Sequence, residues 1–500
     1  MIELQSPLQA AQWLRQHVTG ELRTDSRQVQ PGDGFIAWPG AATDGRQYMA
    51  RAFEQGASAC LMQSEGSAPW QDLQPADRVA ALPQLKQRTG LVADAYYEAP
   101  TQTLSVLAVT GTNGKTSTAC WLAQALAHPA IGQRCGVVGT LGVGLWPQLH
   151  YTGMTTPDPV LLQRSFRQML AAGAQLCAIE ASSIGIAEHR LDGTRIRTAV
   201  FTNFTQDHLD YHGSMQAYWA AKRQLFVWEG LQSVVINIDD DQGRQLAAEL
   251  VDTGLELWTC SRRQDARLRA WPLPSREGLS FEVREGDALC RIDTTLAGDY
   301  NIDNLLGVIG ALRAQGLPLA RIAQACAQLQ AVPGRMQRVV PPQGAGQLPV
   351  AVVDYAHTPD ALSQALQALR PLARERGGQL WCVFGCGGDR DPHKRPLMAA
   401  AAEALADRLV LTSDNPRSEP AAAILSQIRA GLQQPQAATV IEDRALAIQK
   451  ALREAAPADV VLVAGKGHET TQEIAGVFHP FSDIEQLQTA MAARMKAVQA

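Results

Sequence analysis

The sequence lacks a marked excess of charge of either sign. Its 44 Lys and Arg residues against 49 Asp and Glu residues give a formal net charge of −5 and a pI near 6.1. The basic residues are scattered along the chain and form no stripe. This balance gives no electrostatic reason to expect binding to nucleic acid or to an anionic membrane surface.

Segments that would direct the chain into or across a membrane are also missing. No apolar run reaches the length that a bilayer-spanning helix needs. The stretch from Met1 to Gln5 has neither the basic region nor the apolar region of a signal peptide. We therefore expect no membrane span, no signal peptide and a cytoplasmic location.

Cysteine is sparse and shows no sign of a disulfide framework. The nine cysteines, an odd number, lie mostly inside apolar segments, which predicts reduced thiols in the protein core. Cys382 and Cys386 are close enough to raise the question of a metal, but no second Cys/His pair with zinc spacing accompanies them.

What the chain does have is enough apolar residues for several cores. Its 500 residues, 46% of them hydrophobic, suggest about three domains. One seam lies near residues 98–101, and a second is a proline- and glycine-rich stretch from Val332 to Gly346. These seams predict domains at residues 1–99, 100–336 and 337–500.

The alternation of apolar strands with helical patterns predicts an α/β fold. Residues 1–99 mix short strands and helices, as in a small N-terminal α/β domain. Four apolar strands then alternate with helices, which predicts a central doubly wound parallel-sheet domain. Short strands with turns at 255–297 predict a small antiparallel addition, and after the second seam the rhythm restarts as a Rossmann-like domain. The central strands are expected at 104–109, 176–181, 198–203 and 233–238, the C-terminal strands at 350–354, 381–385, 408–412 and 460–464, and the C-terminal helices at 359–373, 397–406, 420–431 and 444–455.

A glycine turn after the first central strand is the strongest functional signal. Backbone N–H groups of such a turn, together with the N-terminus of the following helix, bind phosphate. Lys115 would reach the terminal phosphates of ATP, and the Thr116 hydroxyl would coordinate Mg²⁺. Val109 stands where the usual phosphate-loop pattern has its first glycine. The residues expected to hold ATP are Gly111, Thr112, Asn113, Gly114, Lys115, Thr116 and Ser117.

Further polar residues follow strands at the edge where parallel sheets bind ligands. Glu180 ends the strand 176–181, and its carboxylate suits Mg²⁺, which prefers oxygen ligands. The run Asp207-His208-Leu209-Asp210-Tyr211-His212-Gly213 predicts a charged cleft wall. Lys222, in a predicted helix at 215–228, is by itself an ordinary lysine of an amphipathic helix. In the C-terminal domain, polar clusters follow the strands at 355–357, 386–390, 414–417 and 465–469.

Together these runs resemble the Mur ligase family, ATP-dependent amide-forming enzymes of peptidoglycan synthesis. The resemblance extends from Thr24 to the C-terminus and includes the missing first glycine of the phosphate loop. It rests on the runs Gly111–Ser117, Glu180 with Ser182-Ser183, Asp207–Gly213, Asn301 with Asn304, and Asp354-Tyr355-Ala356-His357-Thr358-Pro359.

The resemblance implies roles that the residues alone do not show. CO₂ would carbamylate Lys222, and the new carboxylate would bind a second Mg²⁺ together with His208. Thr116 and Glu180 would hold the first ion. The implied catalytic residues are therefore Lys115, Glu180, His208 and Lys222, and the further nucleotide contacts are Asn304 to the adenine, with Arg335 and His357 facing the nucleotide.

The family reaction needs no side-chain nucleophile. A substrate carboxylate attacks the γ-phosphate of ATP to give an acyl phosphate, and an amine then displaces phosphate through a tetrahedral intermediate. Positioning and charge neutralisation dominate this chemistry. Because the acyl phosphate must be shielded from water, we expect the third domain to close over the second.

The run Asp414-Asn415-Pro416-Arg417 bears on the amine. An arginine fork binds a carboxylate with about 1.5–3 kcal/mol, which corresponds to about a ten- to hundredfold preference for an amine with an extra carboxylate. The run resembles that of family members that add meso-diaminopimelate, whereas lysine-adding members differ at the arginine. Arg390, Gly465 and Glu469 are carried over with it. L-Lysine remains the alternative amine.

The implied acceptor is UDP-N-acetylmuramoyl-L-alanyl-D-glutamate. The chain departs from the family pattern at Met154, Ile184 and Glu188, where asparagine, histidine and glutamine are usual. A carboxylate at position 188 would repel a diphosphate unless it points away. The positions that match the acceptor site are Thr24, Ser26, Ala41, Ala42, Thr43, Thr155, Thr156, Ser182, Glu188 and Arg190.

Two other interpretations stay open from the sequence. One is a different ligase of the same family, such as a D-glutamate-adding or dipeptide-adding enzyme, or a folylpolyglutamate synthetase. The Arg417 run and the N-terminal domain argue against it. The other is a nucleotide-binding switch or scaffold that makes no product, against which the many polar strand ends argue. We expect a monomer.

Overall fold

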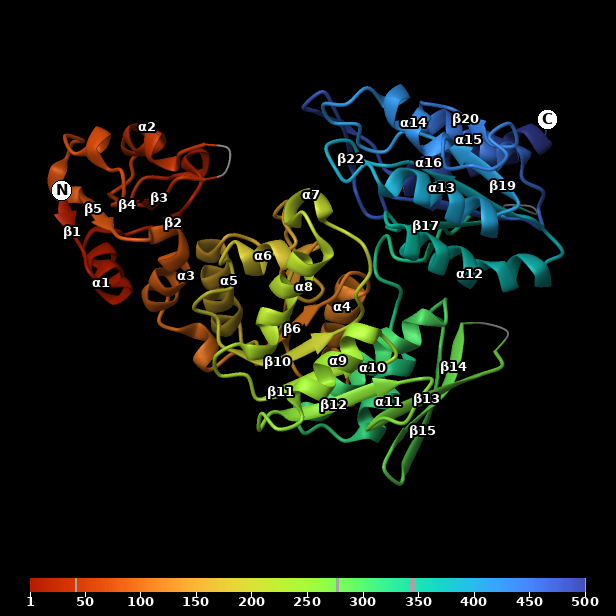
Figure 1. Ribbon diagram of the computed structural model, residues 1–500, viewed down its shortest axis with the longest axis horizontal. Coiled ribbons are helices and arrows are strands. Elements are labelled where there is room, and N and C mark those ends of the chain that lie inside the picture. The colour runs from red at the N-terminus through yellow and green to blue at the C-terminus, as the bar shows by residue number, and fades with distance from the viewer. Residues whose placement is uncertain (41–42, 276–277, 342–347, 500) are drawn as a thin grey trace.

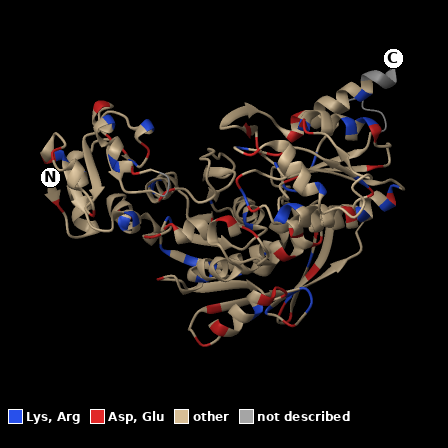
Figure 2. Cartoon of the chain, turned by 45° about the horizontal axis from the view of Figure 1, so that its top comes forward, with Lys and Arg blue, Asp and Glu red and all other residues tan. Residues whose placement is uncertain are grey.

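A computed structural model describes residues 1–40, 43–275, 278–341 and 348–499. Within these residues, three main sheets follow one another along the chain, and Figure 1 shows them as three bodies from red to blue. The three-domain α/β architecture is therefore confirmed, whereas the boundaries after residues 99 and 336 stay predictions. Basic and acidic residues are interspersed over all three bodies in the view of Figure 2. No helix in the described ranges is long and apolar enough to cross a membrane.

The N-terminal sheet is parallel throughout, in the order β1-β5-β4-β3-β2. Its first helix begins at a clear signal, because the Ser6 hydroxyl accepts from the Gln9 N–H and Pro7 occupies the first turn. Its third helix, α3, reaches the central domain. The elements are β1 (Ile2–Glu3), α1 (Pro7–His17), β2 (Leu22–Arg23), β3 (Gly34–Ala37), α2 (Met49–Glu54), β4 (Ala59–Gln63), β5 (Val79–Leu82) and α3 (Leu85–Tyr96).

The central sheet has the order β15-β14-β13-β12-β11-β10-β6-β9-β7-β8. Its seven middle strands pair in parallel, and antiparallel partners extend both edges. The strands are β6 (Ser105–Thr110), β7 (Cys135–Gly139), β8 (Gly142–Leu145), β9 (Leu176–Glu180), β10 (Ile196–Phe201), β11 (Ser233–Asn237), β12 (Glu256–Ser261), β13 (Leu268–Leu273), β14 (Leu279–Glu285) and β15 (Ala288–Thr294).

Helices cover both faces of this sheet (Figure 1) and form two apolar cores. Helix α10 is buried along most of its length, which its mainly apolar sequence explains. The predicted helix at 215–228 is shorter than expected and ends in a 3₁₀ turn at Gln224–Val227. The helices are α4 (Lys115–Ala127), α5 (Pro159–Ala171), α6 (Ser183–Ala187), α7 (Leu209–His212), α8 (Met215–Arg223), α9 (Asp241–Leu250), α10 (Tyr300–Ala314) and α11 (Leu319–Ala327).

The C-terminal sheet has the order β16-β17-β21-β18-β19-β20, parallel except for the β16–β17 pair. All its predicted strands and helices are present, with ends shifted by up to three residues. The elements are β16 (Gln337–Arg338), β17 (Val350–Asp354), α12 (Pro359–Glu375), β18 (Leu380–Phe384), α13 (Lys394–Leu405), β19 (Arg408–Leu411), α14 (Ala421–Arg429), β20 (Thr439–Val440), α15 (Arg444–Glu454), β21 (Val460–Ala464), the hairpin β22 (Thr471–Ile474) and β23 (Val477–Pro480), and α16 (Asp483–Gln499).

Several elements were not predicted. The pair β7–β8 and the hairpin β22–β23 are short strands joined by tight turns, with too few residues for a clear alternation of apolar side chains. The antiparallel addition at 255–297 is partly confirmed, because β12 and β13 continue the parallel pairing and only β14 and β15 are antiparallel. The nine cysteines are free thiols, and all except Cys290 are buried as expected.

A buried ion pair ties the last helix to the C-terminal sheet. The Arg444 guanidinium contacts the Asp483 carboxylate at 2.7 Å, and neither side chain is exposed. The same guanidinium donates to the carbonyls of Ser413 (3.3 Å), just after β19, and Ala464 (2.9 Å), at the end of β21, the two strands that flank β18. Arg444 therefore holds together the loops that carry the 414–417 and 465–469 clusters.

Arg444→Ala is expected to lower the free energy of unfolding by about 3–5 kcal/mol, because it leaves the Asp483 carboxylate buried and unpaired. Urea unfolding measured on the whole chain checks this value. Arg453→Ala on the same helix is the matched control, since that side chain is 77% exposed. Equal stability of the two variants would show that the buried pair makes no net contribution.

Candidate active site

The glycine turn between β6 and α4 has the geometry of a phosphate loop. Gly111 and Gly114 have φ angles of +146° and +86°, which residues other than glycine rarely adopt. A Cβ at Gly111 would lie 1.9 Å from the Thr202 hydroxyl, so the backbone passes very close to the next strand end. Lys115 folds back over the turn and donates to the carbonyls of Gly111 (2.9 Å) and Thr112 (2.8 Å). Burial lowers the pKa of its amine.

The missing first glycine has a structural explanation. Val109 is a fully buried residue inside β6, paired with Val200 on one side and Glu180 on the other. The turn therefore begins only at Gly111. A glycine at position 109 would serve no purpose in the middle of a buried strand.

Thr116 and Glu180 face each other at the ends of neighbouring elements. The Thr116 hydroxyl donates to Glu180 Oε2 (2.9 Å), and the backbone N–H of Thr140 donates to Oε1 (2.8 Å). Arg335, two residues before β16, donates to the same threonine oxygen (3.2 Å). A hydroxyl and a carboxylate so close together are the hard oxygen ligands that Mg²⁺ prefers.

Lys222 is no ordinary helix lysine, because its amine is buried beside the phosphate loop. Its side chain is 1% exposed, and Nζ donates to the Gly111 carbonyl (2.7 Å) and lies 4.5 Å from the centre of the Tyr218 ring. Burial lowers its pKa well below the usual range and the Lys115 charge adds to this, although Asp207 acts against it. A buried amine that is easily deprotonated is the form that reacts with CO₂.

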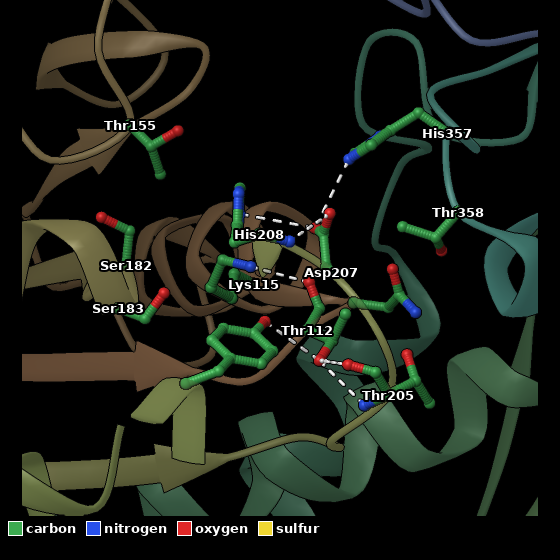
Figure 3. Close-up of polar contacts among 12 residues, drawn as sticks. Thr112, Lys115, Thr155, Ser182, Ser183, Thr205, Asp207, His208, His357 and Thr358 are labelled. Carbon is green, nitrogen blue, oxygen red and sulfur yellow. Dashed lines mark hydrogen bonds and ion pairs between the residues drawn. The ribbon is translucent and has the colours of Figure 1, made fainter. Parts of the chain in front are cut away.

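His208 lies close enough to the Lys222 amine for that charge to act on its ring, and Figure 3 shows it beside Lys115 and Asp207. It is held in a left-handed conformation, with φ of +53°, at the point where β10 has ended and α7 begins. Burial lowers the pKa of its imidazole to about 3, with Lys115 and Lys222 adding to the shift against Asp207. The neutral ring is the form that can bind a metal.

Asp207 is the meeting point of the central and C-terminal domains. Its Oδ2 lies 3.4 Å from His208 Nε2 and 3.7 Å from His357 Nε2 (Figure 3). Its Oδ1 lies 3.9 Å from Lys394 Nζ. Burial would raise its pKa, but these groups hold it well below its usual range. Two further contacts between the domains join Gln206 to Asp391 and Asn113 to Asp360, at 3.2 and 3.0 Å.

The predicted nucleotide contacts surround the phosphate loop. Asn304 donates to Asn301 Oδ1 (2.9 Å), and a Cβ on Gly114 would come within 2.2 Å of the Asn304 side chain. The Arg335 guanidinium lies 4.2 Å from the centre of the Tyr355 ring. Together with His357, which reaches Asp207, these side chains are brought to the same edge of the sheet. Their contacts with ATP stay predictions.

The ends of β19 and β21 form a connected polar network. Asn415 Nδ2 donates to Glu469 Oε2 (2.8 Å), and Lys466 Nζ donates to both Asn415 Oδ1 (2.9 Å) and Glu469 Oε2 (2.8 Å). The carboxylate of Asp414 is buried, and although burial would raise its pKa, Lys466 and Arg444 hold it below the usual value. A Cβ at Gly465 would lie 2.4 Å from this carboxylate, which explains the glycine.

Arg417 is held in a strained and well-defined position beside this network. Its φ is +53°, and its backbone pairs with the β22–β23 hairpin. The guanidinium donates to the Gly388 carbonyl (2.7 Å) and lies 3.2 Å from the Glu473 carboxylate. Arg390, in contrast, is exposed and donates to the Asp389 carbonyl (3.0 Å). A non-glycine residue with such a φ is common at binding sites.

The predicted acceptor residues fall into two groups. In the central domain, the Thr156 hydroxyl lies 2.9 Å from the Ser182 hydroxyl, Thr155 lies 2.9 Å from Thr140, and Arg190 donates to the Thr156 carbonyl (3.0 Å). The others lie in the N-terminal domain. Ser26 is buried at the start of a 3₁₀ turn, and Thr24 forms a hydrogen bond with the Asp158 side chain of the central domain. Thr43 contacts Tyr48 at 3.4 Å, and Ala41 and Ala42 lie outside the described residues.

Comparison with known proteins identifies the family. Family models match residues 109–312 as the Mur ligase middle domain, residues 334–467 as the Mur ligase, glutamate ligase domain, and residues 20–95 as the Mur ligase family, catalytic domain. The chain is 56% identical over 493 residues to the UDP-N-acetylmuramoyl-L-alanyl-D-glutamate–2,6-diaminopimelate ligase of Acidovorax sp. (strain JS42), with 97% of each chain covered. The chain belongs to the Mur ligase family.

Other Mur ligases agree with this result. The ligase of the same name from Pseudomonas aeruginosa is 47% identical, with 95% of each chain covered. A solved structure of a ligase of that name is 35% identical, with a TM-score of 0.63 and 95% of each chain covered. MurF ligase from Thermotoga maritima, solved in complex with ADP, has a TM-score of 0.68 at 17% identity over 97% of this chain and 99% of its own, which shows a shared fold.

The departures from the Mur ligase pattern now have structural contexts. Glu188 forms an ion pair with Lys86 of α3, with 2.7 Å between Glu188 Oε2 and Lys86 Nζ. Met154 is partly exposed, and its sulfur contacts the Arg190 guanidinium at 3.5 Å. Ile184 lies within α6, whose first residue Ser183 contacts His212 at 3.0 Å.

Sequence reasoning assigned no role to several residues that the fold places at the site. Asp207 and Lys466 belonged to quoted motifs, but their spacing gave no sign of their partners. Lys394, Arg444 and Glu473 lay in no quoted motif. Lys394 and Arg444 both begin helices within polar runs, so no local pattern distinguishes them from exposed residues, although both are buried.

The predicted ligands suit Mg²⁺, because they are few and do not enclose a metal ion on their own. Among the described residues, no group of three or more His, Cys, Asp or Glu side chains is arranged to hold a metal ion. The predicted ligands Thr116 and Glu180 form one pair, and His208 with a carbamate on Lys222 would form another. A site with few protein ligands suits Mg²⁺, which keeps waters and binds substrate phosphates.

Proposed function

We propose that this Mur ligase joins meso-2,6-diaminopimelate to UDP-N-acetylmuramoyl-L-alanyl-D-glutamate in peptidoglycan synthesis, with hydrolysis of ATP. The observation that carries the proposal is the 56% identity over nearly the whole chain to a ligase with that name. The geometry supports it in two places. A phosphate loop with buried lysines serves ATP, and the network at Asp414–Arg417 offers an arginine and a carboxylate for a second substrate.

The residues around the phosphate loop would carry the first step. The substrate carboxylate attacks the γ-phosphate, an acyl phosphate forms and ADP leaves. Lys115 now donates to two backbone carbonyls, and turning toward the terminal phosphates would neutralise charge there. Thr116, Glu180, His208 and carbamylated Lys222 would hold the two Mg²⁺ ions, whose positive charge would offset the repulsion of the phosphate and the attacking carboxylate.

The C-terminal domain would carry the second step. An amine attacks the acyl carbon, and the tetrahedral intermediate releases phosphate. Arg417 would bind the distal carboxylate of diaminopimelate, and Glu469 its distal amino group. The contacts of Asp207 with His357 and Lys394 join the two domains, and closure of the C-terminal domain about them would keep water from the acyl phosphate.

Arg417→Ala is expected to lower kcat/KM for meso-diaminopimelate about ten- to hundredfold, because the charged hydrogen bonds to its extra carboxylate are lost. ATP-dependent phosphate release with the UDP dipeptide is measured while the amine is varied. Arg408→Ala is the matched control. Arg408 is exposed at the first residue of β19, at the other end of that strand from the loop that carries Arg417. Release by the unaltered chain with L-lysine but not meso-diaminopimelate would overturn the assigned specificity.

A product assay separates the ligase from a nucleotide-binding switch. Mass spectrometry of the reaction with UDP dipeptide, ATP and meso-diaminopimelate should show the UDP-tripeptide. Nucleotide hydrolysis without this product would favour the switch.

The likeness to Mycobacterium tuberculosis folylpolyglutamate synthase, at 18% identity and a TM-score of 0.61, shows the shared fold alone.

A further inference from the structure

One face of α3 attaches the N-terminal domain to the central domain. Lys86, Gly90 and Asp94 recur every four residues and so lie on one face of the helix. A Cβ on Gly90 would lie 2.0 Å from the Asp192 carbonyl oxygen, and one on Gly193 would lie 2.5 Å from the Gly90 carbonyl oxygen. The helix backbone thus touches the backbone of the segment 188–193 with no room for side chains, which sets the position of this face closely.

At the start of the same face, Lys86 forms an ion pair across the two domains. Its Nζ lies 2.7 Å from Glu188 Oε2, with side-chain exposures of 34% and 26%. The Tyr211 hydroxyl donates to the other oxygen of Glu188. The contacts with Lys86 and then Tyr211 hold the pKa of Glu188 below its usual value, so this carboxylate is charged and depends on these two partners.

The same short segment also carries Arg190, two residues after Glu188. The Arg190 guanidinium donates to the Thr156 carbonyl (3.0 Å), and Thr156 contacts Ser182 (2.9 Å). The segment is therefore held against α3 at both ends, through Glu188 and through Asp192 and Gly193, while Arg190 between them contacts Thr156, one of the residues predicted from the sequence for the acceptor site. A negative charge at Glu188 beside a diphosphate would oppose binding unless it is neutralised.

We propose that Lys86 is a positioning residue for the UDP dipeptide: it neutralises Glu188, turns this carboxylate toward α3 and so orients the segment that carries Arg190. Tyr211 completes the arrangement from the central domain. The inference rests on the proposed function, because it concerns the binding of that acceptor. Lys86 touches neither substrate nor reacting atoms, and its effect passes through Glu188.

A double-mutant cycle between Lys86 and Glu188 tests the proposal on the full chain. KM for the UDP dipeptide, KM for ATP and kcat are measured for the unaltered chain, Lys86→Ala, Glu188→Gln and the double variant. Lys86→Ala is expected to raise KM for the UDP dipeptide about tenfold when Glu188 is present, and less than twofold when Gln replaces it. KM for ATP and kcat should change less than threefold in Lys86→Ala, and Lys86→Arg should restore the KM.

Two controls separate this role from a structural one. Arg88→Ala removes a positive charge from the same helix, about 200° around its axis from Lys86, and should leave every constant unchanged. The thermal midpoint of Lys86→Ala shows whether any loss comes from unfolding. An equal rise of KM in both backgrounds, or no rise in either, would overturn the positioning role. Absence of phosphate release by the unaltered chain would instead contradict the proposed function itself.

Discussion

Replacing Lys115 with alanine is expected to lower kcat about a thousandfold while ATP and the UDP dipeptide still bind. The reason is that a positioned positive charge is needed most when negative charge moves between the γ-phosphate and the attacking carboxylate. Losing one such donor typically costs a hundred- to thousandfold in rate. The neighbouring Lys222 amine donates to the Gly111 carbonyl at 2.7 Å and cannot take over this position without leaving that contact.

The backbone of the phosphate loop explains why binding should survive. Its N–H groups and the N-terminus of α4 bind phosphate without the lysine side chain. Loss of Lys115 removes only two hydrogen bonds, to the carbonyls of Gly111 and Thr112. The measurements are single-turnover phosphate release for the chemical step and equilibrium binding of a non-hydrolysable ATP analogue for affinity.

Lys450→Ala is the matched control for Lys115, because Lys450 forms a surface pair with Glu454 on α15 that contributes little. Its kcat should equal that of the unaltered chain. A fall in affinity for the analogue with kcat unchanged would contradict the argument, because it would mean that Lys115 binds the ground state as strongly as the transition state.

The sequence predicted those parts of the site whose signals are local. The phosphate loop follows β6, Glu180 ends β9 and the 414–417 cluster follows β19, and strands in a parallel sheet end at one edge. The spacing alone therefore placed the groups correctly relative to their own strands. Val109 looked like a defect only until its position inside β6 was known.

What the sequence could not predict depends on contacts between distant segments. Asp207 draws His357 and Lys394 from a different domain, 150 and 187 residues further along the chain as their numbering shows. Lys86 meets Glu188 only because two glycines let α3 approach the segment 188–193. No local pattern encodes such pairs, because each side chain alone has the appearance of a solvated surface charge.

Lys222 shows how burial changes the interpretation of a residue. In the sequence it belongs to an ordinary amphipathic helix, and only the resemblance suggested a carbamate. The fold places its amine at 1% exposure, with its charge disfavoured by burial. After carbamylation the nitrogen keeps one N–H, which can still donate to the Gly111 carbonyl. The new negative charge would lie near Lys115, which favours it.

Lys222→Ala is therefore expected to lower kcat about a hundredfold or more, because it removes a predicted Mg²⁺ ligand and its charge. Formate or acetate should restore part of the activity, since the shortened side chain leaves space for a small carboxylate where the carbamate would lie. Lys222→Arg, which keeps a positive charge but forms no stable carbamate, should be inactive and should not respond to either acid.

The chemical form of Lys222 can be measured independently of activity. With ¹³C-labelled bicarbonate, the unaltered chain should show a carbamate carbon signal that is absent from Lys222→Ala. The thermal midpoints of the variants control for unfolding, because the change empties a buried position. Full activity of Lys222→Ala without added carboxylate would refute the carbamate role, and so would the absence of a carbamate signal from the active unaltered chain. Rescue by acetate but not by chloride at equal ionic strength would show that it is the carboxylate that is required, because a general salt effect would act equally with both anions.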